Sequence, residues 1–361
     1  MLFLSFFDRL LIAFIRLLYH LLRVCYKMMS RQLTNITVLV RSGNQKMKKS
    51  KLSIYEIDQE NTDRRVDNYL LTKLKGLPRS RLYNLIRKGE IRVNKKRIKP
   101  DYRLQFGDQV RVAPMLLDAP KERAKPNDLL INKLKQSVLY EDEKFLVINK
   151  PSGIAVHGGT GLRLGLIECL RVIYPDLPQL ELVHRLDQQT SGCLMVAKKM
   201  SALRELQQLM REAKIDKRYQ TLTLGHWKKN KTTVDLPLKK NTLQSGERMV
   251  RVNHEEGKAS KTIFYQKDQF DGSSFIEARL LTGRTHQIRV HAAQSGHPVA
   301  GDEKYGDKAF NRWAKQCGLR RLFLHACSLS FILPWSGERF TVTAELPDEL
   351  QQVLNVCEGQ R

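Results

Sequence analysis

The chain has 361 residues, of which 42% are hydrophobic, and this composition excludes an intrinsically disordered protein. A chain of this length can fold into more than one domain. The formal net charge of +26 indicates a polyanionic partner, with nucleic acid as the first candidate and an anionic membrane surface as the second. The six cysteines form no Cys-X-X-Cys pair and no group with histidines at zinc spacing, which disfavours a disulfide scaffold and a structural zinc site and fits the reducing cytoplasm.

Residues 1–46 begin with a strongly apolar segment that is interrupted by Asp8 and several arginines. Its apolar runs are shorter than the ~18 residues of a membrane span, and no signal-peptide cleavage site follows. On a helix its basic side chains would gather on one side, which would suit an anionic membrane surface or a partner protein. We favour a third interpretation, in which the native protein begins at Met47 and lacks this leader. Membrane contact is expected only if the leader is translated.

A small domain of two helices and a compact β unit is predicted over residues 64–118, after a disordered lead-in over 47–63. Apolar side chains recur at helical spacing in residues 64–74 and again in residues 80–90, where the helix would end at Gly89. Turn signals then divide the remaining residues of the domain into short strands.

The same domain carries nine basic side chains with few acidic side chains among them. A solvated charged face normally mixes both signs, so this cluster is typical of a surface that contacts an RNA backbone. The residues expected to bind RNA there are Arg79, Arg81, Arg87, Lys88, Arg92, Lys95, Lys96, Arg97 and Lys99.

A linker is predicted over residues 119–133, because proline, lysine and asparagine occur there with little periodicity. A second domain is predicted over residues 134–361. It begins with two apolar strands separated by a turn at residues 141–143, and it contains an amphipathic helix over residues 201–215. Its remaining segments do not show the regular strand and helix alternation of a parallel sheet.

The segment ELVHRLDQQTSG, residues 181–192, contains a single carboxylate at a conspicuous place. Its first residues are typical of a strand, and Gln188 to Gly192 are typical of a turn that cannot be core. Asp187 should therefore lie at the mouth of a cavity, with Arg185 two residues before it and no second acid close by.

Other chemistries that use similar residues are disfavoured. The asparagine of a kinase catalytic loop is missing, since Gly192 occupies its place. A glycosidase needs two facing carboxylates, and Asp187 has no evident partner acid. His286 and His291 lie five residues apart without an HExxH motif or a nearby acid, so ordinary hydrogen-bonded histidines are favoured over a metal site. Among these chemistries, the one that remains depends on a single carboxylate.

Five segments resemble, in the same order, the signature segments of the RluA-type pseudouridine synthases. They are VINKPSGIAVH (147–157), HRLDQQTSG (184–192), RTHQIRVH (284–291), GHPVAGDEKYG (296–306) and RLFLHA (321–326). The basic N-terminal domain is similar to an S4 RNA-binding domain. The resemblance runs from about Arg64 to the C-terminus. The segments GGTGL and KKNTLQSGERMVRV resemble the group of that family that modifies the RNA of the large ribosomal subunit, and that group begins close to Met47.

The resemblance implies an α+β fold: an S4-like domain, followed by a catalytic domain with a mixed, mostly antiparallel sheet flanked by helices. It also implies an isomerase that breaks the N1–C1′ bond of a uridine, turns the uracil and rejoins it through C5, without a cofactor. The family pattern assigns the catalytic carboxylate to Asp187, its arginine partner to Arg289 and the active-site tyrosine to Tyr219.

The roles of these residues stay open in part. Asp187 could act as a nucleophile or as a base at the sugar. A flipped uracil could stack on Tyr219, whose hydroxyl could accept a proton, or Tyr219 could be an ordinary core residue. Arg185 could fill the gap that the flipped base leaves in the RNA, or it could contact a phosphate. Further RNA contacts are expected from His184, Arg284 and His286.

The expected substrate is uridine in bacterial 23S ribosomal RNA, free or in an assembling large subunit, and no obligate protein partner is evident. One alternative is a pseudouridine synthase that acts on transfer RNA. Another, from a different class, is a non-catalytic RNA-binding factor that keeps the fold and assists ribosome assembly.

Overall fold

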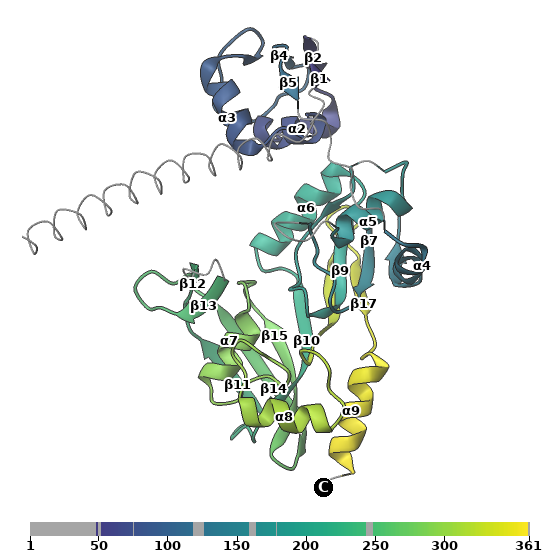
Figure 1. Ribbon diagram of the computed structural model, residues 1–361, viewed down its shortest axis with the longest axis vertical. Helices are drawn as coiled ribbons and strands as arrows, with labels where there is room; N and C mark the ends of the chain where they lie inside the picture. The colour runs from purple at the N-terminus through teal and green to yellow at the C-terminus, as the bar shows by residue number, and fades with distance from the viewer. Residues whose placement is uncertain are drawn as a thin grey trace, which may run out of the picture. The chain divides into compact units, whose positions relative to one another are not determined.

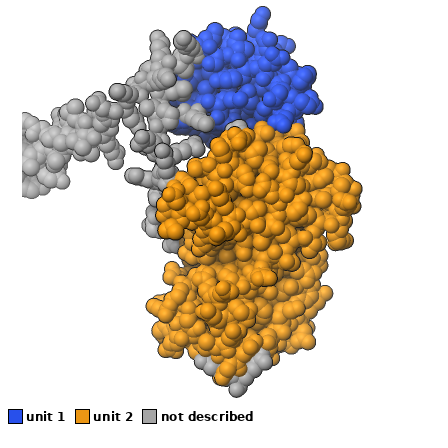
Figure 2. All heavy atoms as spheres, turned by 90° about the vertical axis from the view of Figure 1, so that its right-hand side faces the viewer, with its two compact units in different colours: residues 1–122 blue, residues 123–361 orange. Residues whose placement is uncertain are grey.

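A computed structural model describes residues 48–49, 52–74, 76–117, 126–158, 164–177, 179–242 and 248–359. The chain divides into two compact units, residues 1–122 and 123–361 (Figure 2). The predictions for residues 1–46 lie outside the described residues. Among the described residues, no helix has both the length and the apolar character needed to cross a membrane.

The first unit contains a three-stranded antiparallel sheet and two helices around one apolar core (Figure 1). The sheet has the order β2-β4-β3, and Leu70, Leu82, Ile86 and Val110 are fully buried in the core. The elements of the unit are β1 (Lys48–Lys49), β2 (Ser53–Glu56), the short 3-10 helix η1 (Gln59–Asn61), α2 (Val66–Lys73), α3 (Arg79–Lys88), β3 (Ile91–Val93), β4 (Gln109–Val112) and β5 (Leu116–Leu117), which pairs with β1.

The two helices predicted for the first unit are confirmed as α2 and α3. Gly89 ends α3 in the left-handed region, with φ of 76°, where glycine has no steric cost. The prediction of a disordered lead-in over residues 47–63 is wrong for β2. That strand pairs with β4, and Ile57, just after it, is buried in the core of the unit.

The second unit is built on a ten-stranded sheet in which all neighbours are antiparallel except β9 and β16. This arrangement agrees with the predicted mixed, mostly antiparallel sheet. The order along the sheet is β11 (Lys231–Asp235), β14 (Lys261–Phe270), β15 (Ser273–Leu280), β10 (Asp216–Leu224), β16 (Leu324–Ile332), β9 (Ser191–Ala197), β7 (Phe145–Lys150) and β6 (Val138–Glu141). In addition, β17 (Arg339–Thr343) pairs with β16, β8 (Glu181–Leu182) pairs with β9, and β12 (Leu238–Thr242) and β13 (Arg248–Val252) form a separate hairpin.

Helices and apolar side chains cover both faces of this sheet around β7 and β9. Because successive side chains of a strand point to opposite faces, Leu146 and Ile148 lie in the core that includes α5, whereas Phe145 and Val147 lie in the core that includes α6. The helices of the unit are α4 (Asp128–Gln136), α5 (Leu166–Ile173), α6 (Met200–Arg211), α7 (Gln287–Gln294), α8 (Lys308–Gln316) and α9 (Asp348–Glu358). The predicted strand pair is confirmed as β6 and β7, and the predicted amphipathic helix as α6.

The structure corrects the predicted linker over residues 119–133, because α4 already begins at Asp128. The side chain of Asn127 caps this helix by accepting a hydrogen bond from the backbone N–H of Leu130. Leu134 then anchors the helix in the core, where it is fully buried.

Gly192 is the second residue of β9, which follows the Asp187 loop, and it lies at a place where no side chain fits. Its φ is +108°, and a Cβ atom there would lie 2.2 Å from the carbonyl oxygen of Ala326. The facing strand β16 bulges at this point, so that Ala326 and Cys327 together lie opposite Tyr219 of β10. The close packing at Gly192 thus places the start of β9 against β16, which in turn pairs with β10, the strand that carries Tyr219.

We predict that Gly192→Ala lowers the free energy of unfolding by about 2–3 kcal/mol, because it combines a left-handed backbone with a clash against backbone atoms. Gly272→Ala is the matched control, since Gly272 also has a positive φ, of +66°, but has no atom within 4 Å of its added Cβ. The free energies of unfolding of the two variants, measured with a denaturant, separate the cost of the left-handed backbone from the cost of the clash with Ala326. Equal losses would show that the contact with Ala326 is not tight.

Candidate active site

The loop that carries Asp187 is fastened to the loop that follows β7. The buried ammonium of Lys150 donates hydrogen bonds to the carbonyl oxygens of Pro151, Ile154 and Gln188 at 2.8, 2.9 and 3.1 Å. The backbone N–H of Gly153 also donates to the Gln188 carbonyl at 2.9 Å. Two hydrogen bonds therefore hold the carbonyl of Gln188, one residue after Asp187, which limits the motion of the Asp187 carboxylate.

The prediction that Gln188 to Gly192 form a turn outside the core is correct only for its first part. Thr190 and Ser191 are each 2% exposed, and β9 begins at Ser191. Ser191 can be buried because its hydroxyl makes a 2.9 Å hydrogen bond with Nδ1 of His325 and accepts a 3.0 Å hydrogen bond from Arg321.

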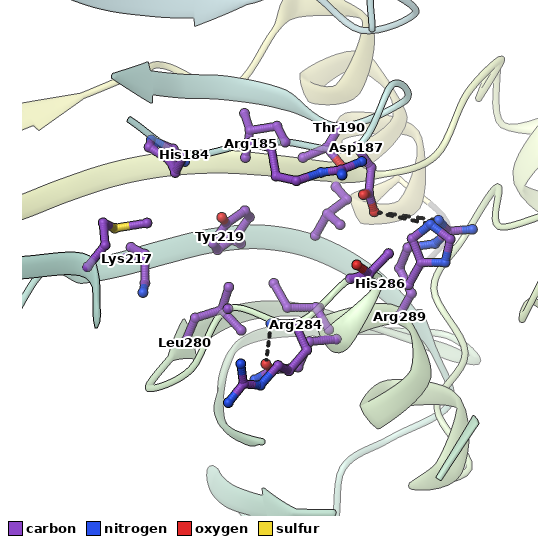
Figure 3. Close-up of a pocket in the computed structure, with 17 residues that line it drawn as sticks. His184, Arg185, Asp187, Thr190, Lys217, Tyr219, Leu280, Arg284, His286 and Arg289 are labelled. Atoms are coloured by element: carbon purple, nitrogen blue, oxygen red, sulfur yellow. Dashed lines mark hydrogen bonds and ion pairs between the residues drawn. The ribbon is translucent and has the colours of Figure 1, made fainter. Parts of the chain in front are cut away.

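The carboxylate of Asp187 is flanked by two nitrogen groups on one side only (Figure 3). Nη1 of Arg289 and Nε2 of His286 each lie 3.7 Å from the same oxygen, Oδ2. Within the described part of the chain, Oδ1 has neither a hydrogen bond nor an ion pair. The side chains of Arg289 and His286 thus both face Oδ2, while Oδ1 stays available for a substrate.

Arg289 is held by a second acid, Asp302, which has no exposed surface on its side chain. Nε and Nη2 of Arg289 donate two hydrogen bonds of 2.7 Å to the two oxygens of Asp302. Burial alone would raise the pKa of Asp302, but the hydrogen bonds and charge of Arg289 outweigh burial, so this pKa lies below its ordinary value. The two-point contact fixes the guanidinium plane and leaves Nη1 to face Asp187.

His286 is oriented by Tyr305. The hydroxyl of Tyr305 accepts a hydrogen bond from the backbone N–H of Val250 at 2.8 Å, and it lies 2.9 Å from Nδ1 of His286. Burial lowers the pKa of His286, which favours the neutral ring. A neutral ring that accepts at Nδ1 from the Tyr305 hydroxyl carries its proton on Nε2, which faces Asp187. His286 also has a left-handed backbone with φ of 54°, an uncommon conformation that is concentrated at functional sites.

A cavity of about 300 Å³ extends from Asp187 along β10. Its size is at the lower end of the ~300–1,000 Å³ range of ligand pockets. All seven residues that the sequence predicted for the catalytic domain line this one cavity, namely Asp187, Tyr219, Arg289, Arg185, His184, Arg284 and His286. The nine basic residues predicted to bind RNA belong to the first unit.

Tyr219 forms part of the cavity wall and is 8% exposed. Burial raises its pKa, and the nearby charge of Asp187 raises it further, so the phenol stays protonated at neutral pH. This favours a role as a surface for stacking over a role as an ionised base. Tyr219 packs in the apolar core and also lines the cavity, so it can be a core residue and a stacking surface for the uracil at the same time.

The other residues predicted to contact RNA differ in whether their side chains form hydrogen bonds within the protein. Nε2 of His184 accepts a hydrogen bond from the backbone N–H of Met195 at 3.1 Å, and burial lowers its pKa to about 4, so the ring is neutral. Nε of Arg284 donates to the carbonyl of Ala259 at 3.2 Å. Arg185 is exposed at the cavity, and its guanidinium has no hydrogen-bond or ion-pair partner among the described residues.

The nine basic residues of the first unit are mostly exposed. None of them forms an ion pair with a carboxylate in the ranges that the structure describes. Their charges are therefore not neutralised within the described protein, as a surface for phosphate groups requires.

Sequence reasoning missed three residues of the site: Asp302, Tyr305 and Lys217. Asp302 and Tyr305 lie in the segment GHPVAGDEKYG, which was identified only as a resemblance without any role. Lys217 lines the cavity and is two residues before Tyr219 on β10. The alternation of side chains along a strand places these two residues on one face, and this signal could have identified Lys217.

His286 and His291 do not share a site, although the sequence places them five residues apart. Nδ1 of His291 lies 2.9 Å from the hydroxyl of Thr262, and its Nε2 lies 3.1 Å from the hydroxyl of Ser260. Among the described residues, no three His, Cys, Asp or Glu side chains lie together as metal ligands would.

Two family models match the chain. Residues 144–294 match the model described as RNA pseudouridylate synthase, and residues 64–110 match the S4 domain. A curated relative from Pasteurella multocida is 50% identical over 307 residues, which cover 84% of this chain and 94% of the relative. This chain therefore belongs to the RNA pseudouridylate synthases, a family of isomerases, and it carries an N-terminal S4 domain.

The relative from Pasteurella multocida bears the name "Ribosomal large subunit pseudouridine synthase C". A protein of the same name from Escherichia coli strain K12 is 46% identical over 313 residues, covering 86% of this chain and 98% of that protein. Among solved structures, human RNA pseudouridylate synthase domain containing 1 is 28% identical, with a TM-score of 0.50 over 62% of this chain and 87% of that one. Human RNA pseudouridylate synthase domain containing 4 shares the fold, with 24% identity, a TM-score of 0.54 and coverage of 64% of this chain and 96% of that one.

Proposed function

We propose that this protein converts uridines of large-subunit ribosomal RNA to pseudouridine, with Asp187 as the catalytic carboxylate. The observation that carries the proposal is the position of Asp187, whose Oδ1 is uncommitted within the described chain and whose Oδ2 faces Arg289 and His286. The names of the relatives support the class of RNA, since their identity of 46–50% extends over nearly their whole length.

The reaction needs a charged group beside C1′ of the ribose. The N1–C1′ bond breaks with its electron pair on the base, and the C5–C1′ bond then forms as the proton leaves C5 and N1 is protonated. Atoms and electrons balance without a change of oxidation state, so no redox cofactor is required by the chemistry. Oδ1 of Asp187 could attack the sugar or remove a proton from it, and either role needs an ionised carboxylate.

The base must leave its stack in the RNA to enter the cavity, which costs a few kcal/mol. Tyr219 offers a ring on which the uracil can stack, and Arg185 offers an exposed planar cation at the cavity. We propose that Arg185 compensates part of this cost by occupying the gap in the RNA.

The S4 domain would then supply affinity for the RNA rather than chemistry. A buried ribosomal uridine is hard to reach in a finished subunit, so we propose free or partly assembled RNA as the substrate. A cytoplasmic location follows from that substrate. No obligate protein partner is part of the proposal.

Mapping pseudouridines in ribosomal and transfer RNA from cells that lack the protein tests the proposed function. Loss of specific pseudouridines from the large-subunit RNA is expected. Loss only from transfer RNA would support the alternative substrate, and a ribosome-assembly defect without any lost pseudouridine would support a non-catalytic assembly factor.

The contribution of the S4 domain can be measured separately. Replacing Lys95, Lys96 and Arg97 together by glutamine should weaken binding to long ribosomal RNA. The slope of log affinity against log salt concentration should also become less steep, by roughly 0.7–0.9 for each phosphate contact that is lost. Lys267→Gln, at an exposed lysine of β14, is the control. An unchanged slope in the triple variant would mean that the cluster is only a solvated face.

A further inference from the structure

Lys217 is a buried lysine at the part of the cavity farthest from Asp187 in the close-up view (Figure 3). It is 4% exposed, and it lies on the same face of β10 as Tyr219. Asp187, Tyr219 and Lys217 therefore follow one another along the cavity in that view. The ammonium of Lys217 makes no hydrogen bond or ion pair with any residue that the structure describes.

The acid next to Lys217 in the sequence does not neutralise it. Asp216 points to the other face of β10, where its carboxylate accepts hydrogen bonds from Arg218 at 3.2 Å and from Arg279 at 2.8 Å. Burial lowers the pKa of Lys217, and the charge of Asp216, which acts in the opposite direction, does not outweigh burial. A cation on a largely buried side chain is costly unless a polar group pairs with it, and Lys217 lines the cavity, where its ammonium is available to a ligand.

The shape of a uridine identifies that group. If C1′ is next to Asp187 and the uracil is stacked on Tyr219, the atom of the ring farthest from the sugar is C4, which lies opposite N1. Its oxygen O4 then points along the cavity toward Lys217. When the base has turned so that C5 is next to C1′, C2 is the opposite atom, and O2 takes the place of O4. Substrate and product thus both present a carbonyl oxygen at the same position.

We propose that Lys217 is a further catalytic residue, which donates a hydrogen bond to O4 of the bound uridine and to O2 after the base has turned. The inference rests on the proposed function and deepens it. While the base is detached, the electron pair of the broken N1–C1′ bond is delocalised over N1, O2 and O4. A fixed cation at the far edge of the ring stabilises this charge in either orientation of the base.

The same contact selects the base. Cytosine carries an amino group at C4, and an ammonium that faces this amino group would be left without an acceptor. A site whose buried polar group stays unpaired discriminates strongly against the wrong ligand. Lys217 therefore favours uracil over cytosine.

The catalytic role is tested with Lys217→Met in the full chain. An RNA fragment that contains the target uridine is first chosen by mapping the products of the wild-type protein on large-subunit and transfer RNA. Loss of one preorganised donor should lower kcat by roughly 100- to 1,000-fold. Lys267→Met, at the exposed lysine of β14, should keep wild-type kcat. A kcat of Lys217→Met within threefold of wild type would overturn the proposal.

The contact between Lys217 and O4 is tested by a second measurement, which would not respond to Lys217 if this lysine were merely structural. Binding is compared for two RNAs, one with the target uridine and one with pyrimidin-2-one riboside, which lacks O4, at that position. Both proteins carry Asp187→Asn so that no product forms. With Lys217 present, loss of O4 should weaken binding by roughly ten- to a hundredfold. With Lys217→Met, both RNAs should bind within twofold of each other.

The alternative results are distinct. An equal penalty for the missing O4 with and without Lys217 would overturn the contact. Weaker binding of both RNAs to the same extent in Lys217→Met would indicate a phosphate contact instead and would also overturn it. Lys217→Gln, which keeps a donor without the charge, serves if the methionine variant does not fold, and it should keep part of the discrimination. The proposed function fails separately, at the mapping step, if wild-type protein leaves large-subunit RNA unmodified.

Discussion

Replacing Asp187 by asparagine should abolish uridine isomerisation and leave RNA binding nearly unchanged. Asparagine has almost the same shape, but its amide cannot attack C1′ or accept a proton from the sugar as a carboxylate can. We expect kcat to fall by more than roughly a thousandfold, equivalent to ~4 kcal/mol of activation free energy. The measurement is pseudouridine formation in a large-subunit RNA fragment, with RNA affinity measured in parallel.

The matched control is Asp176→Asn, because Asp176 is exposed on a turn of the same unit and carries no proposed role. Its activity should equal that of the wild type. Activity of Asp187→Asn within tenfold of wild type, a change of only ~1.4 kcal/mol, would exclude a mechanism that depends on this one carboxylate. The wild-type enzyme should also keep its activity in a metal chelator, and loss of activity there would revive a metal-dependent mechanism.

Local patterns made part of the fold predictable. The helices α2, α3 and α6 each have apolar side chains at helical spacing on one face, and this pattern depends only on neighbouring residues. The turn between β6 and β7 was predictable for the same reason, because Asp142 accepts hydrogen bonds from the backbone N–H groups of Lys144 and Phe145.

Buried elements and long-range contacts were not predictable in this way. In α7, Gln287, Ile288, Arg289, Val290, His291 and Ala292 are all buried, so the helix has no amphipathic pattern. The parallel pairing of β9 with β16 joins Gly192 to Ala326, far apart in the sequence, and no local signal specifies such a partner. A linker was expected over residues 119–133, which include the first part of α4, because the polar composition of this segment hides the capping asparagine Asn127.

The candidate site shows the same division. The motif around Asp187 and the family resemblance were enough to predict seven of the residues that line the cavity, but not Lys217. The residues that hold them in place were missed, since Asp302 and Tyr305 act through Arg289 and His286 rather than through a motif of their own. Such supporting contacts depend on the three-dimensional arrangement of several segments.

The pair of Asp302 and Arg289 gives the second large effect, on both stability and activity. Asp302→Asn leaves the charge of Arg289 in a buried site without its two-point partner. Removing one member of a buried pair typically costs about 3–5 kcal/mol of unfolding free energy. Freed from Asp302, Arg289 can turn to Asp187 and pair with it directly, which would occupy the carboxylate and misplace it. A displacement of about 1 Å can lower the rate by about a hundredfold, and we expect a loss of kcat of that order.

Stability and activity of Asp302→Asn are measured together. The three tryptophans of the chain, Trp227, Trp313 and Trp335, all lie in the second unit, so their fluorescence during urea unfolding reports on the unit that contains the pair. Because Arg289 keeps the pKa of Asp302 below its ordinary value, the advantage of the wild type should be complete at neutral pH and shrink as the pH falls below the ordinary carboxyl range. Asp235→Asn is the control, since its 2.7 Å ion pair with Lys261 is largely exposed and should contribute less than ~1 kcal/mol. Equal stabilities for the two variants would show that Asp302 does not hold Arg289 in place. A normal kcat in a destabilised Asp302→Asn variant would show that the position of Asp187 does not depend on the ion pair between Asp302 and Arg289.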